Sequence, residues 1–168
     1  MKKYIHAIDN LNDWIGKIVA WLTTFMVLIV CVDVGIRYLL GGKIEMGALL
    51  SELEWHIFSI VFLFGAAFTL RHDKHVRVDL FYARWGKKTQ ALVNLLGCIF
   101  LLIPFSWIVI EASIPYILDS WAVKESSSDA GGLPARYLIK ACIPIGMVLL
   151  ILQATAFMGK SWVVLTEK

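Results

Sequence analysis

Four long apolar stretches constrain the fold of this chain more than any other feature of its sequence. They cover residues 15–39, 53–70, 91–118 and 138–164. A helix rises about 1.5 Å per residue, so about 20 apolar residues cross the roughly 30 Å of hydrocarbon in a bilayer. The stretches are close to or above this length, and the sequence lacks the alternating segments of a membrane barrel. It therefore predicts an all-α integral membrane protein with four transmembrane helices.

Composition supports the same interpretation. The mean hydropathy is +0.73, and 59% of the residues are hydrophobic while only 17% are charged. A length of 168 residues is short for several domains, so we expect one four-span membrane domain over residues 1–168. Lys2 and Lys3 precede a polar stretch that continues to Asp13, and the apolar run that follows is too long for a signal peptide. The first span is therefore expected to remain in the mature protein.

Basic residues are unequally divided between the two ends of the predicted spans. One side holds Lys2, Lys3, Lys17, Arg71, Lys74, Arg77, Arg84, Lys87, Lys88, Lys160 and Lys168, and the other holds Arg37, Lys43, Lys124, Arg136 and Lys140. Connections rich in lysine and arginine remain in the cytoplasm. The bias predicts that both termini and residues 71–90 are cytoplasmic.

Three segments outside the spans have their own pattern. Residues 4–15 place Tyr4, Ile8, Leu11 and Ile15 on one helical face, with Asp9, Asn12 and Asp13 elsewhere, which predicts a short interfacial helix. A second interfacial helix, interrupted at Gly86, is predicted over residues 79–93. Residues 124–134, "KESSSDAGGLP", combine serines, glycines and a proline, which predicts a non-helical loop.

Ionisable residues within the spans are interpreted first as functional candidates. Asp33 and Arg37 are four residues apart and are expected to pair along one helix. Glu111 and Lys140 lie at similar depths in the third and fourth spans, so we expect a second ion pair there. The competing interpretation is that these are structural pairs or snorkelling side chains. No continuous series of polar residues crosses the bilayer, which argues against a proton or ion conduit.

The remaining polar residues give little support for a catalytic or cofactor site, so no enzyme activity and no cofactor are expected. His72 and His75 with Asp73 and Asp79 are a weak metal pattern. No two histidines are placed to clamp a haem, and the three cysteines form no C-x-x-C motif. Asp79 is instead expected to cap a following helix.

Two stretches carry a resemblance to a known family. Glu54, "FGAAFTLR" and "HVRVD" at residues 75–79, with the later "GGLPARYLIKACIPIGMVLLILQ", resemble the small membrane subunit (DctQ-like) of tripartite ATP-independent periplasmic (TRAP) transporters. The resemblance covers nearly the whole chain. Matched by position, Glu54, Arg71, His75, Arg77 and Asp79 follow the family pattern and would form a structural or partner-binding elbow.

The resemblance also implies partners and a location. Such a subunit is expected in the bacterial inner membrane, bracing a large multi-span subunit that binds substrate and sodium. A periplasmic binding protein would deliver an organic acid-type solute. Arg71 and Arg77 could bind phospholipid headgroups or the large subunit, and no nucleic-acid partner is expected. The alternatives are a membrane anchor subunit of a redox complex and a small self-sufficient channel.

Overall fold

Long helices make up nearly all of the described chain. The computed structural model describes residues 2–40, 46–72, 82, 84–129 and 131–166. The α-helices are α1 (Lys2–Leu40), α2 (Met46–Arg71), α4 (Lys87–Gly97), α5 (Ile103–Ala122) and α6 (Arg136–Thr166). No residue within these described ranges lies in a strand. Four helical segments are long and apolar enough to cross a membrane, which confirms the predicted fold class.

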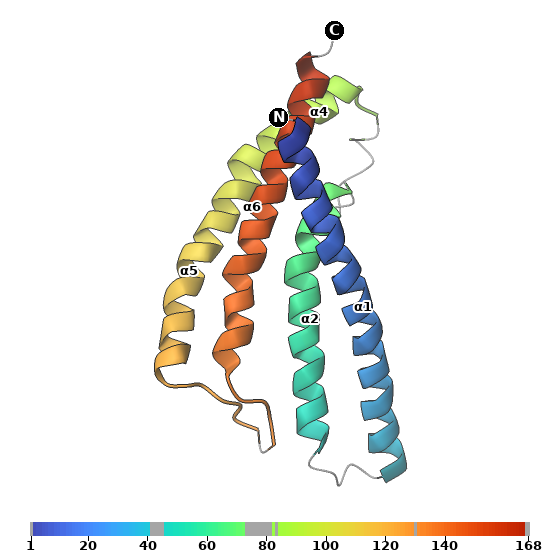
Figure 1. Cartoon of the computed structure of the whole chain (residues 1–168), viewed down its shortest axis with the longest axis vertical. Helices are drawn as coiled ribbons and strands as arrows, with labels where there is room; N and C mark the ends of the chain where they lie inside the picture. The colour runs from blue at the N-terminus through green and yellow to red at the C-terminus, as the bar shows by residue number, and fades with distance from the viewer. Residues whose placement is uncertain (1, 41–45, 73–81, 83, 130, 167–168) are drawn as a thin grey trace.

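The helices run between two distinct ends of the molecule. The first residues of α1 and the last residues of α6 lie at one end, called here the termini end (Figure 1). The last residues of α1 and α5 and the first residues of α2 and α6 lie at the opposite end, called the loop end. Helix α6 is central, because it contacts α1, α2, α4 and α5.

The third span contains an irregular turn. A π-helical turn, η1 (Cys98–Leu102), joins α4 to α5, so Lys87–Ala122 is one long helical segment. Pro104 follows this turn and is one of the first residues of α5. Proline has no N–H and crowds the carbonyl four residues earlier, which favours a local departure from α-helical hydrogen bonding. The segment begins after Gly86, where the sequence predicted an interruption; residues 79–81 and 83 of the predicted interfacial helix lie outside the described residues.

Close packing of α2 on α6 is concentrated at small residues and a short apolar core. Leu70, Cys98, Met147, Leu150 and Phe157 form the centre of that core together with Ala154. A Cβ atom on Gly146 would lie 3.0 Å from the Leu63 Cβ and 3.1 Å from its carbonyl oxygen. Small residues allow helices to approach closely where lipid supplies no hydrophobic drive between them.

The N-terminal segment differs from its prediction. Residues 4–15 are not a separate interfacial helix but the first turns of α1, which has 39 residues. At helical rise this length is about 58 Å, well beyond the hydrocarbon thickness. Ile8 is buried as expected, but Asp9 and Asn12 are buried with it, while Tyr4 and Leu11 are exposed. The inward face of this segment is therefore largely polar.

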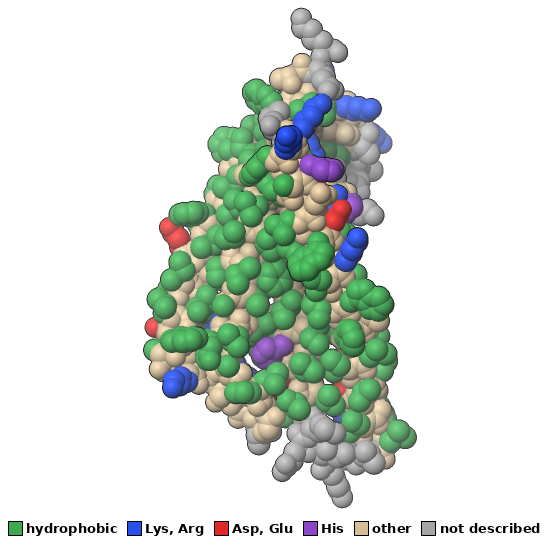
Figure 2. Space-filling model, in the orientation of Figure 1, with side chains coloured by type: hydrophobic (Ala, Val, Ile, Leu, Met, Phe, Trp, Pro, Cys, Tyr) green, Lys and Arg blue, Asp and Glu red, His purple; other side chains and the backbone are tan. Residues whose placement is uncertain are grey.

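Side-chain chemistry also differs along the length of the bundle. Hydrophobic side chains cover most of the visible face at mid-height, and lysine and arginine side chains gather toward the termini end (Figure 2). Aromatic side chains are exposed near both ends of the spans, including Trp14, Trp85 and Trp121. This distribution is typical of a helical bundle in contact with lipid around its middle.

Candidate functional site

Polar side chains, some of them buried, gather in two main clusters, one at each end of the bundle. The termini-end cluster consists of Asp9, Asn12, Asp13, Arg71, His72, Gln153 and Lys160. The loop-end cluster consists of Glu52, Glu125, Ser127, Arg136 and Lys140. Each cluster contains two carboxylates and two arginine or lysine side chains. The formal charge of each cluster is therefore zero when His72 is neutral. Buried ions are stable only when they are paired and hydrogen-bonded in this way.

The centre of the termini-end cluster is a carboxylate on α1 held by α6. Lys160 Nζ lies 2.9 Å from Asp9 Oδ1 and 2.7 Å from Oδ2. Gln153 Nε2 donates to Asp9 Oδ1 over 3.1 Å, and Asn12 Nδ2 donates to Gln153 Oε1 over 2.8 Å. Asn12 and Gln153 are fully buried. This chain of bonds connects the start of α1 to the second half of α6.

The last turn of α2 joins the same cluster through Arg71. Arg71 Nη1 donates to the Asp9 carbonyl oxygen over 2.6 Å and forms an ion pair with Asp13. His72 Nε2 lies 3.5 Å from Asp13 Oδ1. The sequence assigned Arg71 to headgroups or to a partner protein. In the structure its guanidinium contacts α1 of the same chain, and a contact with headgroups or a partner stays a prediction.

At the loop end, Glu52 is almost completely buried beneath the α5–α6 loop. Its carboxylate accepts hydrogen bonds from Ser127 Oγ and the Leu133 N–H, and Arg136 Nη2 lies 2.7 Å from Oε1. A Cβ atom on Gly132 would collide with Ser127, so only glycine fits at this position. The loop is non-helical over residues 124–134, apart from the undescribed Ala130, as predicted. Glu52 is the residue that anchors this loop to α2.

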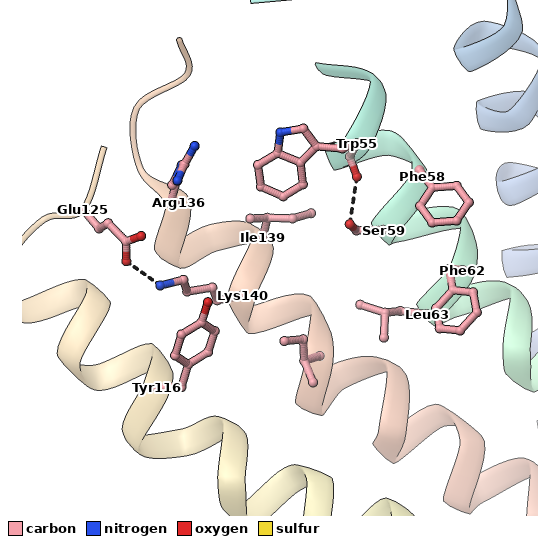
Figure 3. A pocket seen from close by; sticks show the side chains of 11 residues that line it. Trp55, Phe58, Ser59, Phe62, Leu63, Tyr116, Glu125, Arg136, Ile139 and Lys140 are labelled. Atoms are coloured by element: carbon pink, nitrogen blue, oxygen red, sulfur yellow. Dashed lines mark hydrogen bonds and ion pairs between the residues drawn. The ribbon is translucent and has the colours of Figure 1, made fainter. Parts of the chain in front are cut away.

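Lys140 forms the second ion pair at the loop end. Its Nζ donates to Glu125 and lies 3.9 Å from the centre of the Tyr116 ring (Figure 3). The hydrogen bond from Lys140 lowers the pKa of the Glu125 carboxyl below its ordinary value of 4.5, although burial acts in the opposite direction. Arg136 lies over the Trp55 ring at 5.8 Å. Both cations are therefore held between a carboxylate and an aromatic ring.

This arrangement corrects the predicted Glu111–Lys140 pair. Glu111 is exposed and accepts a hydrogen bond from Trp107 Nε1 over 2.8 Å. Ser106, Ser113 and Ser120 are the buried residues of α5, and α5 packs on α6. Glu111 precedes Ser113 by two residues, which at about 100° per residue places it on the opposite side of the helix. Lys140 instead lies beside Tyr116 and Glu125, and the rotation of α5 turns Glu111 away from α6.

The structure does bring Asp33 and Arg37 together on α1. Arg37 Nε lies 2.7 Å from Asp33 Oδ2. Glu54 on α2 is near enough to attract the same guanidinium. Asp33 Oδ1 and Glu54 Oε1 are buried and have no hydrogen-bond partner among the described residues. These three side chains form a smaller charged group between α1 and α2.

Three residues of the predicted elbow, His75, Arg77 and Asp79, lie outside the described residues, as does Asp73. Within the described ranges, no three His, Cys, Asp or Glu side chains converge on a common point as metal ligands would. Of the predicted elbow, only Arg71 and Glu54 are placed, and they lie in opposite halves of α2, 17 residues apart.

Sequence reasoning missed most of the termini-end cluster. It placed Asp9, Asn12 and Asp13 away from the packed face, although their spacing of three and four residues marks one helical stripe. It gave no role to Gln153, a polar residue in the middle of the last apolar run. Such a residue in a span is a signal in itself, because burial requires a hydrogen-bond partner. The partner of Gln153 lies 141 residues away in the sequence.

The comparisons with known proteins agree with the resemblance described from the sequence. Residues 26–163 match the family described as "Tripartite ATP-independent periplasmic transporters, DctQ component". This range includes the second and third spans, nearly all of the fourth and the last part of the first. No curated protein and no solved structure is significantly similar to the chain.

Proposed function

The chain belongs to the DctQ component family of tripartite ATP-independent periplasmic transporters, and we propose that it is the scaffold subunit that braces the large transport subunit. As a DctQ component it is a small, multi-pass part of a transporter that also contains a large membrane subunit and a periplasmic binding protein. We place it in the bacterial inner membrane. The proposed transport is sodium-driven uptake of an organic acid-type solute.

The observation that carries the scaffold role is the position of the charged groups. In the described residues, the two main ion clusters lie at opposite ends of the bundle. Between them the core is apolar, with Gly146, Met147 and Leu150 on α6 packed against α2 and α5. Ion transport requires polar groups along the path, because a charge in hydrocarbon is costly. A bundle tied at both ends is suited to holding a fixed shape beside a moving partner.

Reconstitution tests this proposal directly. Proteoliposomes with a sodium gradient are prepared with this chain alone, with the large subunit and binding protein alone, and with all three. We expect no solute uptake by this chain alone and the highest uptake by the complete set. Uptake by the isolated chain would reject the scaffold role. Uptake that is unchanged when this chain is omitted would also reject it.

We propose further that the elbow residues after α2 contact the large subunit. Arg77 can hold carboxylate or phosphate oxygens with two parallel hydrogen bonds, a geometry that lysine does not reproduce. Asp79 is proposed to cap a following helix. Arg77→Lys and Asp79→Ala should therefore reduce co-purification with the large subunit, and Arg84→Lys, at an exposed position, is the matched control. Arg71 is unsuitable for this test because its loss would disturb α1. Normal co-purification of both variants would remove the elbow from the interface.

A further inference from the structure

A cavity at the loop end opens between α2, α5 and α6 beside the loop-end cluster. Its volume is about 310 Å³. Trp55 and Phe58 contribute from α2, Tyr116 from α5, and Arg136 and Lys140 from α6 (Figure 3). Both cations of the loop-end cluster therefore line a space that the chain itself leaves unfilled.

The lining of this cavity changes from polar to apolar along the helix axis. Arg136, Lys140 and Glu125 line its outer part, at the beginning of α6 and in the preceding loop. Ile143 lies one turn deeper on α6, and Phe62 and Leu63 lie two turns deeper than Trp55 on α2. Seven residues of helix correspond to about 10 Å, so the polar and apolar ends are separated by that distance. This gradient fits an amphiphile whose head lies at the membrane surface.

The charged groups retain capacity to bind a ligand. About 26% of the Arg136 side chain, 13% of Lys140 and 31% of Glu125 are exposed. Arg136 uses Nη2 for Glu52 and Ser127, and its Nε is buried, so the exposed part of the guanidinium is what a ligand can reach. Lysine carries three donor hydrogens, of which Glu125 takes one. Oxygens of a phosphodiester can accept hydrogen bonds from the exposed parts of both cations.

We propose that this cavity is a binding site for a phospholipid with an ethanolamine headgroup. The phosphate accepts hydrogen bonds from Arg136 and Lys140, and the ammonium lies near Glu125. One acyl chain runs inward along Phe58, Phe62 and Ile143. Trp55 and Tyr116 border the headgroup, a position that amphipathic aromatic rings favour at membrane surfaces.

Charge balance favours this headgroup over an anionic one. Glu52 and Glu125 already neutralise Arg136 and Lys140, so a net-negative lipid would add an uncompensated charge beside two carboxylates. A zwitterion places one charge of each sign against a group of opposite sign and adds none overall. The apolar inner wall of the cavity favours a phospholipid over a free phosphate, because a free phosphate would contact only the polar outer part of the cavity. The proposal does not depend on the scaffold role.

A titration of the purified full chain in detergent tests the proposal. The probe is a diacyl phospholipid with an ethanolamine headgroup, and the readout is the apparent Kd from the rise in Tm. We expect at least tenfold weaker responses to diacylglycerol with the same chains, to water-soluble glycerophosphoethanolamine and to inorganic phosphate. An equal response to diacylglycerol would show a site for acyl chains alone, and an equal response to phosphate would show a free anion site. Either result would overturn the proposal.

Variants locate the binding to this cavity. Glu125→Gln combined with Lys140→Gln removes the ammonium and its paired carboxylate while keeping the cluster neutral, and a lost charge-assisted hydrogen bond should weaken lipid binding about tenfold or more. Ser59→Phe fills the cavity without altering its charges and should have a similar effect. Lys88→Gln, at an exposed position of α4, is the control and should bind lipid normally.

Two further results would overturn the proposal. One is binding by Ser59→Phe as tight as that of the control, because the lipid would then lie elsewhere. The other is loss of the lipid response when the chain is bound to its large subunit, because the cavity would then be a protein contact. Ser59→Phe keeps the test valid if the double variant fails to fold.

Discussion

At the scale of single residues, the termini-end cluster depends on Asp9. Asp9→Asn and Lys160→Met should each lower the free energy of unfolding by about 1.5–3 kcal/mol, because hydrogen bonds between charged groups are lost. The double variant should lose less than the sum of the two, since neither partner is left without its counter-charge. A double-mutant cycle on unfolding in detergent measures this coupling. Asp119→Asn, at an exposed position of α5, is the control, and strictly additive losses would show that Asp9 and Lys160 do not stabilise each other.

Another residue-scale consequence concerns pH at the loop end. Lys140 lowers the pKa of Glu125 in the folded chain below the ordinary value of 4.5. The unfolded state therefore binds the proton more readily, and the stability that Glu125 contributes is present above its ordinary pKa and is lost as the pH falls through the lowered one. Tm measured from about pH 7 to about pH 3 should fall more steeply for the wild type than for Glu125→Gln. Parallel curves would contradict the ion pair.

At the scale of helices, the contact of α1 with α2 depends on Gly16. A Cβ atom at Gly16 would overlap the Phe68 ring, whereas nothing lies within 4 Å of a Cβ at Gly35 on the same helix. Gly16→Ala should destabilise the chain by about 1–3 kcal/mol through overpacking. Gly35→Ala should be neutral or stabilising by up to about 1 kcal/mol, because alanine favours the helix. Unfolding of the two variants in detergent compares them, and equal stability would show that α1 and α2 are not in close contact at Gly16.

At the scale of the whole molecule, orientation follows from the distribution of basic residues. We expect the termini end to face the cytoplasm, because the positive charge concentrated there favours retention on that side. A reporter fused after residue 168 should be active in the cytoplasm, and one inserted within residues 124–132 should be active outside. A third fusion within residues 41–45 should match the second, because the end of α1 and the start of α2 lie at the loop end. A periplasmic reporter at residue 168 would reverse the topology and place the proposed lipid site in the inner leaflet.

The features that the sequence predicted correctly are those that depend on one segment of the chain alone. Whether a stretch can cross a bilayer is a sum over its own side chains, so all four spans were recognised without knowledge of their neighbours. The α5–α6 loop was recognised for the same reason, from its serines, glycines and proline. Asp33 and Arg37 are four residues apart on one helix, and their pairing also requires only local geometry.

Contacts between helices depend on rotation and on distant partners, which only the tertiary structure decided. The sequence suggested similar depths for Glu111 and Lys140, yet the rotation of α5 turns Glu111 outward, and Lys140 pairs with Glu125. From the sequence, Asp9 and Asn12 are expected at the surface. In the structure, Arg71 of α2 and Gln153 and Lys160 of α6 contact this part of α1. The sequence by itself determined which segments enter the membrane, because transfer into lipid is additive along the chain. The tertiary structure decided which polar groups are buried, because burial is favourable only where a partner from another helix meets them.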